Sequence, residues 1–254
     1  MSPWAFSHGA HLRCRFPGST APPVAVDRTF LLFLRRLAAR PDWPSRSASA
    51  ISAKMTVTLS DIKRQKKVLR DEALGRRDAL DPQFRVEAAL GMAERAATEL
   101  SVEPGAVVSG FWPMLSEVDV RPLMWALHEK GARLCLPAIL DKTTIVFREL
   151  LREAPLIDMG FGTSGPGPHA PVLDPDLMLV PLAAFDARGH RIGYGAGYYD
   201  RAIAALDARG RLPRLLGIAF DCQEVPRVPD LPHDVPLPEI LTERGFRRFP
   251  ETAA

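Results

Sequence analysis

The sequence predicts an α/β sandwich built on a mostly parallel sheet, and two patterns lead to this prediction. An apolar run at 106–111, an amphipathic segment at 120–130 and a second apolar run at 133–136 follow one another with short connections. Strands joined through a helix in this way pair in parallel, with the helix on one face of the sheet. The run 177–181 (LMLVP) is apolar throughout, as a strand buried on both faces is, so we expect it at the centre of the sheet.

The first helix is expected to start at residue 60 or 61. Ser60 or Asp61 can cap it by accepting a hydrogen bond from a free N–H group of the first turn. Offsets of seven and eleven residues return to nearly the same angle of a helix, which places three apolar residues on one stripe: Ile62, Leu69 and Ala73.

Two basic residues share this stripe. Lys66 lies on it and Arg70 lies at its margin, whereas Lys63, Arg64 and Lys67 occupy the other faces. Long cationic side chains often lay an apolar stem along a core and keep the charge in water, which is one explanation. The other is that Lys66 and Arg70 face a cleft that holds an anion.

The remaining elements follow from local patterns. A second helix is expected from Asp81-Pro82 towards Leu100, because proline is favoured at the first helical position, and Pro104-Gly105 should end it. It should run through Phe84, Ala88 and Met92. The helix at 120–130 should stop at Gly131 and turn four residues inward: Val120, Leu123, Met124 and Leu127. We further expect an edge strand at 144–151, a loop at 160–171, a turn at 185–189, a helix through Ile203 and Leu206, and strands at 215–219 and 240–242.

The composition is that of a globular protein with a substantial core. The chain has 254 residues, of which 46% are hydrophobic and 25% are charged, enough for one large domain or two small ones. No apolar run approaches the roughly 20 residues that a membrane-spanning helix needs, so we expect a soluble protein without a membrane partner. The three cysteines form no CxxC pair, which argues against a disulfide framework or a cysteine zinc site.

Basic residues concentrate in the first 54 residues, which hold eight Lys or Arg against two acidic residues. The remainder is mildly acidic, so we expect no nucleic-acid partner. Because this segment is broken by prolines and has no sustained period, we expect residues 1–58 to be a disordered extension and 59–250 to be the folded domain. Met55 stands just before the patterned sequence, which favours a misassigned start; an organelle-targeting segment and a functional tail are the alternatives.

A glycine-rich loop leads from the turn at 185–189 into the helix through Ile203. Bare N–H groups beside a helix N-terminus suit phosphate oxygens, although a purely structural tight turn would have the same pattern. The loop is no Walker loop, and Tyr198 stands where a GxGxxG fingerprint has its last glycine. Asp200 in the first helical turn favours phosphate binding, because magnesium is usually held by one or two carboxylates together with the phosphates.

Two further segments carry polar groups. In the stretch PHDVP the prolines fix the direction of His233 and Asp234, which offers a second carboxylate; a rigid loop without a catalytic part is an equal alternative. After the first strand, Trp112 and Met114 could pack on a flat heteroaromatic ring, and Glu117 could accept hydrogen bonds from its exocyclic amines. A carboxylate that only stabilises a helix N-terminus is the alternative for Glu117.

Together these segments resemble the 5-formyltetrahydrofolate cyclo-ligase family, also called methenyltetrahydrofolate synthetases, over about residues 60–249. The motifs occur in the family's order: KKVLR at 66–70, SEVDVRPL from Ser116, LVPLAAFDARGHRIGYGAGYYDR at 179–201 and PHDVP from Pro232. The resemblance implies a three-layer sandwich of the sugar-phosphate-isomerase and CoA-transferase type. It also implies that 5-formyltetrahydrofolate is closed to 5,10-methenyltetrahydrofolate with ATP and Mg²⁺, through a phosphorylated formyl group, with release of ADP and phosphate.

The resemblance assigns a nucleotide side to the site. Lys66 and Arg70 would grip the ATP phosphates, and both would act in catalysis together with Tyr199, which would help line the shared cleft. The nucleotide would also contact the loop residues Gly193, Tyr194, Gly195, Ala196, Gly197, Tyr198 and Tyr199.

The metal and folate sides follow in the same way. Asp200 and Asp234 would be the magnesium ligands, and Trp112 and Glu117 would bind the reduced folate. We expect a cytoplasmic monomer, with organelle targeting by residues 1–54 as the alternative.

The chain departs from the family pattern at three positions. Ala196 stands where relatives have Gly or Lys, Leu182 replaces the usual Gly before the Phe-Asp turn, and Gly165 stands where a Glu-Pro pair often precedes Pro166. We expect the change at Ala196 to remove a contact on the phosphate side and the change at Gly165 to weaken one near the nucleotide.

Two other functions fit parts of the pattern. A folate- or nucleotide-binding module of the same fold would bind ligand without consuming ATP. A phosphosugar isomerase would need no ATP, and it would leave Lys66, Arg70 and the two carboxylates without a purpose.

Overall fold

The structure is a computed structural model that describes residues 58–153, 155–160 and 162–250. The predicted extension therefore lies outside the described residues, apart from Thr58. Within the described part of the chain, no helix is both long and apolar enough to cross a membrane.

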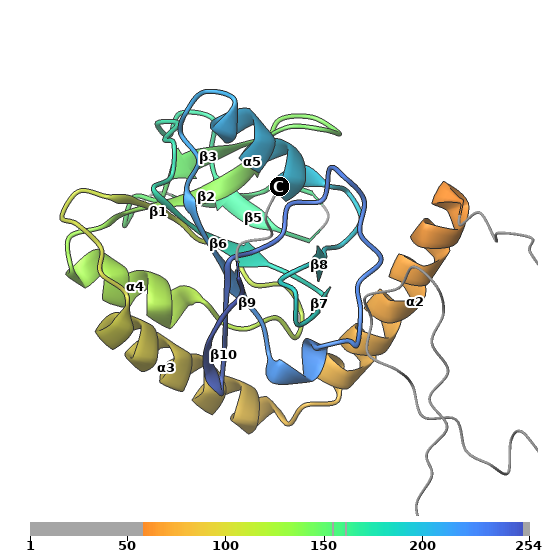
Figure 1. Ribbon diagram of the computed structural model, residues 1–254. Helices are drawn as coiled ribbons and strands as arrows, with labels where there is room; N and C mark the ends of the chain where they lie inside the picture. Colours follow the sequence, from red (N-terminus) through yellow and green to blue (C-terminus); the bar gives the residue numbers. More distant parts are fainter. Residues whose placement is uncertain (1–57, 154, 161, 251–254) are drawn as a thin grey trace, which may run out of the picture. The chain divides into compact units, whose positions relative to one another are not determined.

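The described chain contains four α-helices, one 3₁₀ helix and eleven strands (Figure 1). The helices are α2 (Leu59–Asp78), α3 (Pro82–Glu99), α4 (Arg121–Glu129), α5 (Tyr198–Asp207) and the 3₁₀ helix η2 (Asp221–Gln223). The strands of the main sheet are β1 (Val107–Ser109), β2 (Arg133–Ile139), β3 (Ile145–Glu149), β6 (Leu177–Pro181), β9 (Arg214–Ile218), β10 (Glu239–Thr242) and β11 (Gly245–Arg248). Two small hairpins are formed by β4 (Leu156–Asp158) with β5 (Ser164–Pro166) and by β7 (Ala184–Phe185) with β8 (Arg191–Ile192).

The main sheet has the order β11-β10-β9-β6-β1-β2-β3. The five inner strands are parallel, and the edge strands β3 and β11 run antiparallel to their neighbours. The predicted central strand, β6, is the middle one of the seven. The predicted fold class, a three-layer sandwich on a mostly parallel sheet, is confirmed.

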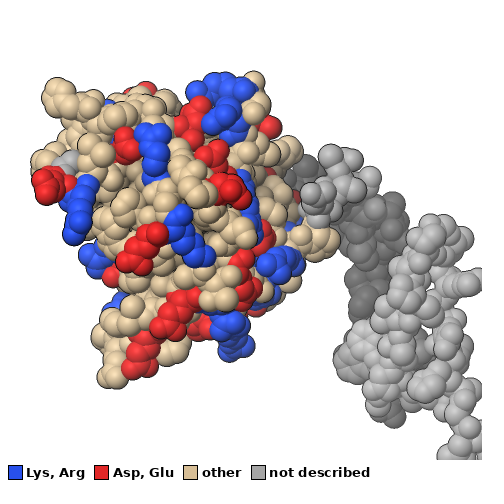
Figure 2. Space-filling model, turned by 90° about the vertical axis from the view of Figure 1, so that its left-hand side faces the viewer, with Lys and Arg blue, Asp and Glu red and all other residues tan. Residues whose placement is uncertain are grey.

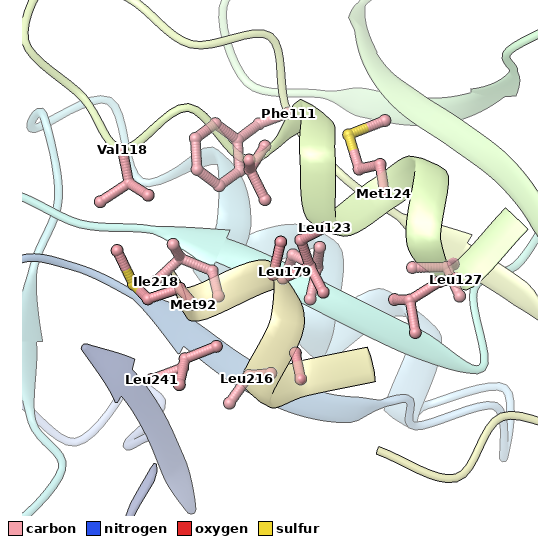
Figure 3. Close-up of a cluster of buried hydrophobic side chains, with 14 of the residues drawn as sticks. Met92, Phe111, Val118, Leu123, Met124, Leu127, Leu179, Leu216, Ile218 and Leu241 are labelled. Atoms are coloured by element: carbon pink, nitrogen blue, oxygen red, sulfur yellow. The ribbon is translucent and has the colours of Figure 1, made fainter. Parts of the chain in front are cut away.

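The pleat of β6 separates two hydrophobic cores. Leu177 and Leu179 join the cluster beneath α3 and α4, whereas Met178 and Val180 join the cluster beneath α5. Since successive side chains of a strand point to opposite faces, helices on both sides are needed to bury such a run. Figure 1 shows α3 and α4 on one face of the sheet and α5 on the other. Figure 3 shows the first cluster, where side chains of α3 and α4 meet those of the strands.

Helix α2 packs differently from the other three. Its Ala73 joins a third, smaller cluster with Ala184 and Ile192 of the β7–β8 hairpin and with two valines of the following segment, Val225 and Val228. Only two residues of α2 are buried, Ala73 and Arg77. This helix therefore brings few apolar side chains to the fold, and its basic stripe faces the hairpin and the loop after it.

The predicted helices agree with the structure except at their ends. The first helix begins at Leu59 and its cap is Thr58, because Thr58 and Asp61 exchange reciprocal hydrogen bonds; the predicted cap at Ser60 or Asp61 is wrong. Asp81 and Pro82 start α3 as predicted, but the helix ends at Glu99, before Pro104, because the chain turns to bury Leu100.

Some of the predicted strands and loops differ as well. The segment 160–171 contains β5, which pairs with β4 to form a hairpin where we predicted only loop. The turn at 185–189 is the tip of the β7–β8 hairpin. The strand at 240–242 is not the last, because β11 follows it and forms the edge of the sheet.

Basic and acidic side chains are mixed on the surface. Figure 2 shows Lys and Arg interspersed with Asp and Glu over one face of the described chain. Opposite charges also pair at the surface of the described chain, as in Arg133–Glu149 and Arg214–Glu239.

Candidate active site

Helix α2 directs two predicted phosphate contacts into one place. The Nζ of Lys66 lies 2.5 Å from Oδ2 of Asp234, and the Nε of Arg70 donates to the carbonyl oxygen of Gly193 at 2.8 Å. Both side chains are half-buried, as expected from their place on the stripe. The structure thus brings together the predicted KKVLR, glycine-loop and PHDVP segments. In each of these two contacts the paired residues lie more than 120 positions apart in the sequence.

The two predicted magnesium ligands are neighbours. The Oδ1 of Asp200 accepts from Arg191 at 2.9 Å and from the N–H of Val235, next to Asp234, at 3.2 Å. Asp234 uses its Oδ2 for Lys66 and for the N–H of Leu231. Burial lowers the pKa of Arg191, and the charges of the two carboxylates oppose this effect.

The donor set fits a magnesium ion that shares its ligands with phosphate. Oδ2 of Asp200 and Oδ1 of Asp234 accept no hydrogen bond from the described residues, so one hard oxygen of each carboxylate is available. No group of three or more His, Cys, Asp or Glu side chains suited to a metal occurs among the described residues. The remaining ligands would have to be phosphate and water oxygens, which is the usual pattern for magnesium bound with a nucleotide.

The glycine loop is held in a specific conformation. Gly197 caps α5 with a left-handed backbone (φ 68°), which glycine adopts without steric cost. Gly195 has a φ of 102°, which residues with a Cβ rarely adopt, and the Arg70 guanidinium lies against it. Arg201 fastens the loop from the other side: it donates to the carbonyl oxygens of Ala196 at 2.8 Å and Thr143 at 2.6 Å.

Glu117 is buried and bound through both oxygens. Its Oε1 accepts from the Tyr194 hydroxyl at 2.6 Å, and its Oε2 accepts from the N–H of Met114 at 2.8 Å. Burial raises the pKa of Glu117, while these two hydrogen bonds and the charge of Arg77 favour the ionised form. The predicted folate-side carboxylate therefore contacts the glycine loop directly, through Tyr194.

The loop that carries Glu117 is closed on itself. The N–H of Glu117 donates to the carbonyl oxygen of Met114 at 3.0 Å, in addition to the contact of the carboxylate. Between these residues Leu115 has a φ of 52°, a backbone conformation that costs roughly 1–2 kcal/mol for a residue with a Cβ. Its side chain is 98% exposed, so no packing within the described chain compensates this strain.

Trp112 lies at the margin of this arrangement. Its ring packs against the core beneath α3 and α4, and the Arg121 guanidinium covers it at 5.3 Å from the ring centroid. Asp119 holds Arg121 in place through two hydrogen bonds. Within the described residues Trp112 makes no hydrogen bond to Glu117, so its role towards folate stays a prediction.

The two tyrosines that start α5 point to different places. The Tyr198 hydroxyl donates to the carbonyl oxygen of Asp141, and its ring lies 5.4 Å from the Arg201 guanidinium. The Tyr199 hydroxyl is buried and has no hydrogen-bond partner among the described residues. Burial raises the pKa of Tyr199, so this hydroxyl is protonated and able to donate to a ligand. Such an orphaned donor fits the prediction that Tyr199 lines the cleft.

The three departures from the family pattern have structural counterparts. Leu182 is buried and packs over Gly217, where a Cβ would come within 3.0 Å of it. Gly165 lies in β5, and a Cβ there would lie 2.9 Å from the carbonyl oxygen of Pro137. Ala196 is exposed and uses its carbonyl oxygen for Arg201. The bulk of Leu182 is thus accommodated by a glycine on the neighbouring strand β9.

Two buried cations, Arg77 and Arg191, were not predicted from the sequence. Arg77 lies seven residues, about two helical turns, after Arg70, so extending the basic stripe beyond Arg70 would have found it. Arg191 lies in β8 and contacts Asp200 only because the hairpin brings it there. No local pattern distinguishes it from a surface arginine.

Comparisons with known proteins identify the family of this chain. A family model described as the 5-formyltetrahydrofolate cyclo-ligase family matches residues 62–243. The 5-formyltetrahydrofolate cyclo-ligase of Escherichia coli (strain K12) is 31% identical over 182 residues, covering 66% of this chain and 94% of the relative. That of Haemophilus influenzae is 30% identical over 131 residues, covering 49% of this chain and 69% of the relative.

A solved structure extends the comparison to the fold. The NMR structure of the Aquifex aeolicus 5,10-methenyltetrahydrofolate synthetase has a TM-score of 0.60 at 26% identity, covering 74% of this chain and 95% of that chain. Since the family model spans well over half of the chain and contains every predicted site residue, the chain belongs to the 5-formyltetrahydrofolate cyclo-ligase family of enzymes.

Proposed function

We propose that this chain closes 5-formyltetrahydrofolate to 5,10-methenyltetrahydrofolate in a reaction that needs ATP and magnesium and releases ADP and phosphate. One observation carries the proposal beyond family membership. Four separate segments meet around the glycine loop: the basic stripe of α2, the Glu117 loop, the start of α5 and the PHDVP stretch. These segments bring the cations Lys66 and Arg70 near three carboxylates, those of Glu117, Asp200 and Asp234, which supports the proposal.

The chemistry of the substrate explains why a nucleotide is needed. An N-formyl group is an amide, too poor an electrophile for the neighbouring amine, and its oxygen is a poor leaving group. In the proposed reaction the formyl oxygen attacks the γ-phosphate of ATP and ADP departs, which gives an imidate phosphate. The second amine then adds to the activated carbon, and phosphate leaves as the methenyl bridge forms.

The residues of the chain act mainly by positioning and by charge. Lys66 and Arg70 would bind phosphate oxygens, helped by the N–H groups of the glycine loop at the start of α5. For Lys66 this means exchanging Asp234 for phosphate, which releases a carboxylate oxygen at the moment the nucleotide arrives. Asp200 and Asp234 would hold magnesium, which offsets phosphate charge when bound.

The folate side would rely on Glu117 and Tyr199. The Glu117 carboxylate would accept hydrogen bonds from the N–H groups of the folate ring. The Tyr199 hydroxyl, which is buried without a partner among the described residues, would donate to an oxygen of the reacting groups. No nucleophilic side chain is required, because every bond forms between substrate atoms.

The test is a spectrophotometric assay of the purified chain with 5-formyltetrahydrofolate and magnesium, with and without ATP. The near-ultraviolet absorbance of the methenyl product is expected to appear only with ATP. Ligand binding without product would instead indicate a binding module of the same fold. Activity on a sugar phosphate without nucleotide would indicate an isomerase.

We also propose that residues 59–250 form the catalytic domain, acting as a monomer in the cytoplasm. The family match falls within these bounds, which supports the domain assignment. A chain that starts at residue 58 should keep the full ATP-dependent activity, and light scattering should give the mass of one chain. Loss of activity on removal of residues 1–57 would contradict the domain assignment.

A further inference from the structure

A buried arginine connects the two loops of the site. Arg77 projects from α2 and is only 2% exposed. Its Nε donates to the Ser116 hydroxyl at 2.9 Å, and one terminal nitrogen donates to the Tyr194 hydroxyl at 2.9 Å. The Ser116 hydroxyl donates in turn to Asp78, the next residue of α2. Arg77 therefore contacts both the Glu117 loop and the glycine loop.

Tyr194 passes this contact on to Glu117. A phenol has one proton to donate and lone pairs with which to accept. Because Tyr194 accepts from Arg77, its proton is directed to Oε1 of Glu117, at 2.6 Å. One oxygen of the buried carboxylate is thus held by a hydrogen-bond chain that begins at Arg77.

The surroundings of Glu117 make the charge of Arg77 important. Burial opposes ionisation of this carboxyl. The titratable groups that act on it are Arg77 from α2, Tyr194 from the glycine loop and Tyr199 from α5. Asp78 of α2 is one contact further away, bonded to the Ser116 hydroxyl. Arg77 is the cation of this set within the described chain, so it is the group that offsets the charge of Glu117.

We propose that Arg77 is a positioning residue that acts through Tyr194 and Ser116 to hold Glu117 as a carboxylate aimed at the substrate. The identity of the substrate, a folate whose ring N–H groups donate to Glu117, rests on the proposed function. The same contacts couple the folate-side carboxylate to the loop that would bind the nucleotide. Arg77 itself touches neither substrate in this arrangement.

The first test needs no substrate. The titration of the Glu117 carboxyl is followed by infrared difference spectroscopy, with Glu117→Gln as the reference that identifies its band. In Arg77→Met the carboxyl is expected to titrate at higher pH than in the unmodified chain, because its counter-charge is gone. An unchanged titration would overturn the proposal, and this result stands even if no methenyl product ever forms.

The second test uses the methenyl assay. Arg77→Met and Tyr194→Phe are each expected to raise the KM for 5-formyltetrahydrofolate about tenfold, the effect of losing one hydrogen bond to a charged group. In Arg77→Met the acidic limb of kcat/KM should move to higher pH, and Arg77→Lys should largely restore it. Tyr194→Phe removes only one hydroxyl from a residue that is 41% exposed, so it keeps the KM test available if Arg77→Met does not fold.

The matched control is Arg76→Met. Arg76 is the preceding residue of α2, and its guanidinium donates to the carbonyl oxygens of Cys222 and Glu224, on the side of η2. Its KM and pH profile are expected to be those of the unmodified chain. Equal effects of Arg76→Met and Arg77→Met would show that Arg77 only stabilises α2, and would overturn the proposal. A lower kcat in Arg77→Met without a shift in the acidic limb of its pH profile of kcat/KM would do the same.

Discussion

Lys66 and Asp234 form an ion pair of 2.5 Å between Nζ and Oδ2, joining α2 to the segment after β9. Their side chains are only 15% and 17% exposed, so water and salt screen the pair weakly. In the proposed reaction each would have a different partner, phosphate for the cation and magnesium for the carboxylate. The pair therefore competes with both ligands.

This competition predicts opposite effects of one substitution. Lys66→Met should strengthen the binding of Mg²⁺ alone, because Asp234 loses its cation, and should weaken the binding of ATP about tenfold or more. Isothermal titration with Mg²⁺ and with a non-hydrolysable ATP analogue measures both. Lys67→Met is the control, since Lys67 pairs with the exposed Asp71. If Lys66→Met weakened both ligands or neither, the competition would not exist.

Arg201 is expected to act on nucleotide binding without touching the nucleotide. It ties the glycine loop to the β2–β3 turn through the carbonyl oxygens of Ala196 and Thr143. Arg201→Gln should raise the KM for ATP several-fold with a smaller effect on the KM for folate, because the loop is less well ordered. Arg209→Gln, in the turn just after α5 and bonded to Asp174, should leave both KM values unchanged. Equal effects on the two KM values would show that Arg201 does not act through the loop.

Two glycines should respond to alanine with opposite signs. At Gly217 of β9 a Cβ would lie 2.7 Å from Leu237 and 2.9 Å from Ile240, so Gly217→Ala should lower the free energy of unfolding by about 1–3 kcal/mol. At Gly91 of α3 a Cβ would meet nothing within 4 Å, so Gly91→Ala should raise it by about 0.5–1 kcal/mol. Urea denaturation of the two variants checks both values. A tolerated alanine at Gly217 would mean that the packing around Leu182 is looser than the structure indicates.

Glu117 should make stability depend on pH. Burial raises its pKa in the folded chain, so the folded state binds this proton more tightly than the unfolded state does. The cost of ionising Glu117 is absent below the pKa of an unfolded glutamate and complete above the raised folded pKa. As pH rises through this window, the free energy of unfolding should fall in the unmodified chain relative to Glu117→Gln. Parallel pH curves for the two proteins, measured by urea denaturation, would contradict the assignment.

The strands of the sheet could be predicted where their side chains are fully buried, but not where the side chains are partly exposed. The run at β6 is apolar on both faces, which is the pattern of a strand covered by helices on both sides of a parallel sheet. By contrast, β11 has the sequence GFRR, with half-exposed residues that pair only because β10 lies beside them. The β4–β5 hairpin lies in a stretch rich in glycine and proline, which indicates a loop by composition.

The site shows the same division. The stripe of α2 indicated that Lys66 and Arg70 face inward, because a helical period is a local property of the sequence. The contacts of Ser116 with Asp78 and of Arg191 with Asp200 depend on how separate elements pack against one another. Periodicity carries no information about such contacts, so they could only come from the structure.

The small apolar face of α2 has a consequence for how the site opens and closes. Of its twenty residues only Ala73 and Arg77 are buried, so much of what holds this helix to the rest of the described chain is ionic and hydrogen-bonded. Elements held in this way are released in local openings that leave the central strands intact. We expect the amide protons of α2 to exchange with deuterium before those of β6, and ATP with magnesium to slow them. The nucleotide would then complete the docking of the helix that binds it.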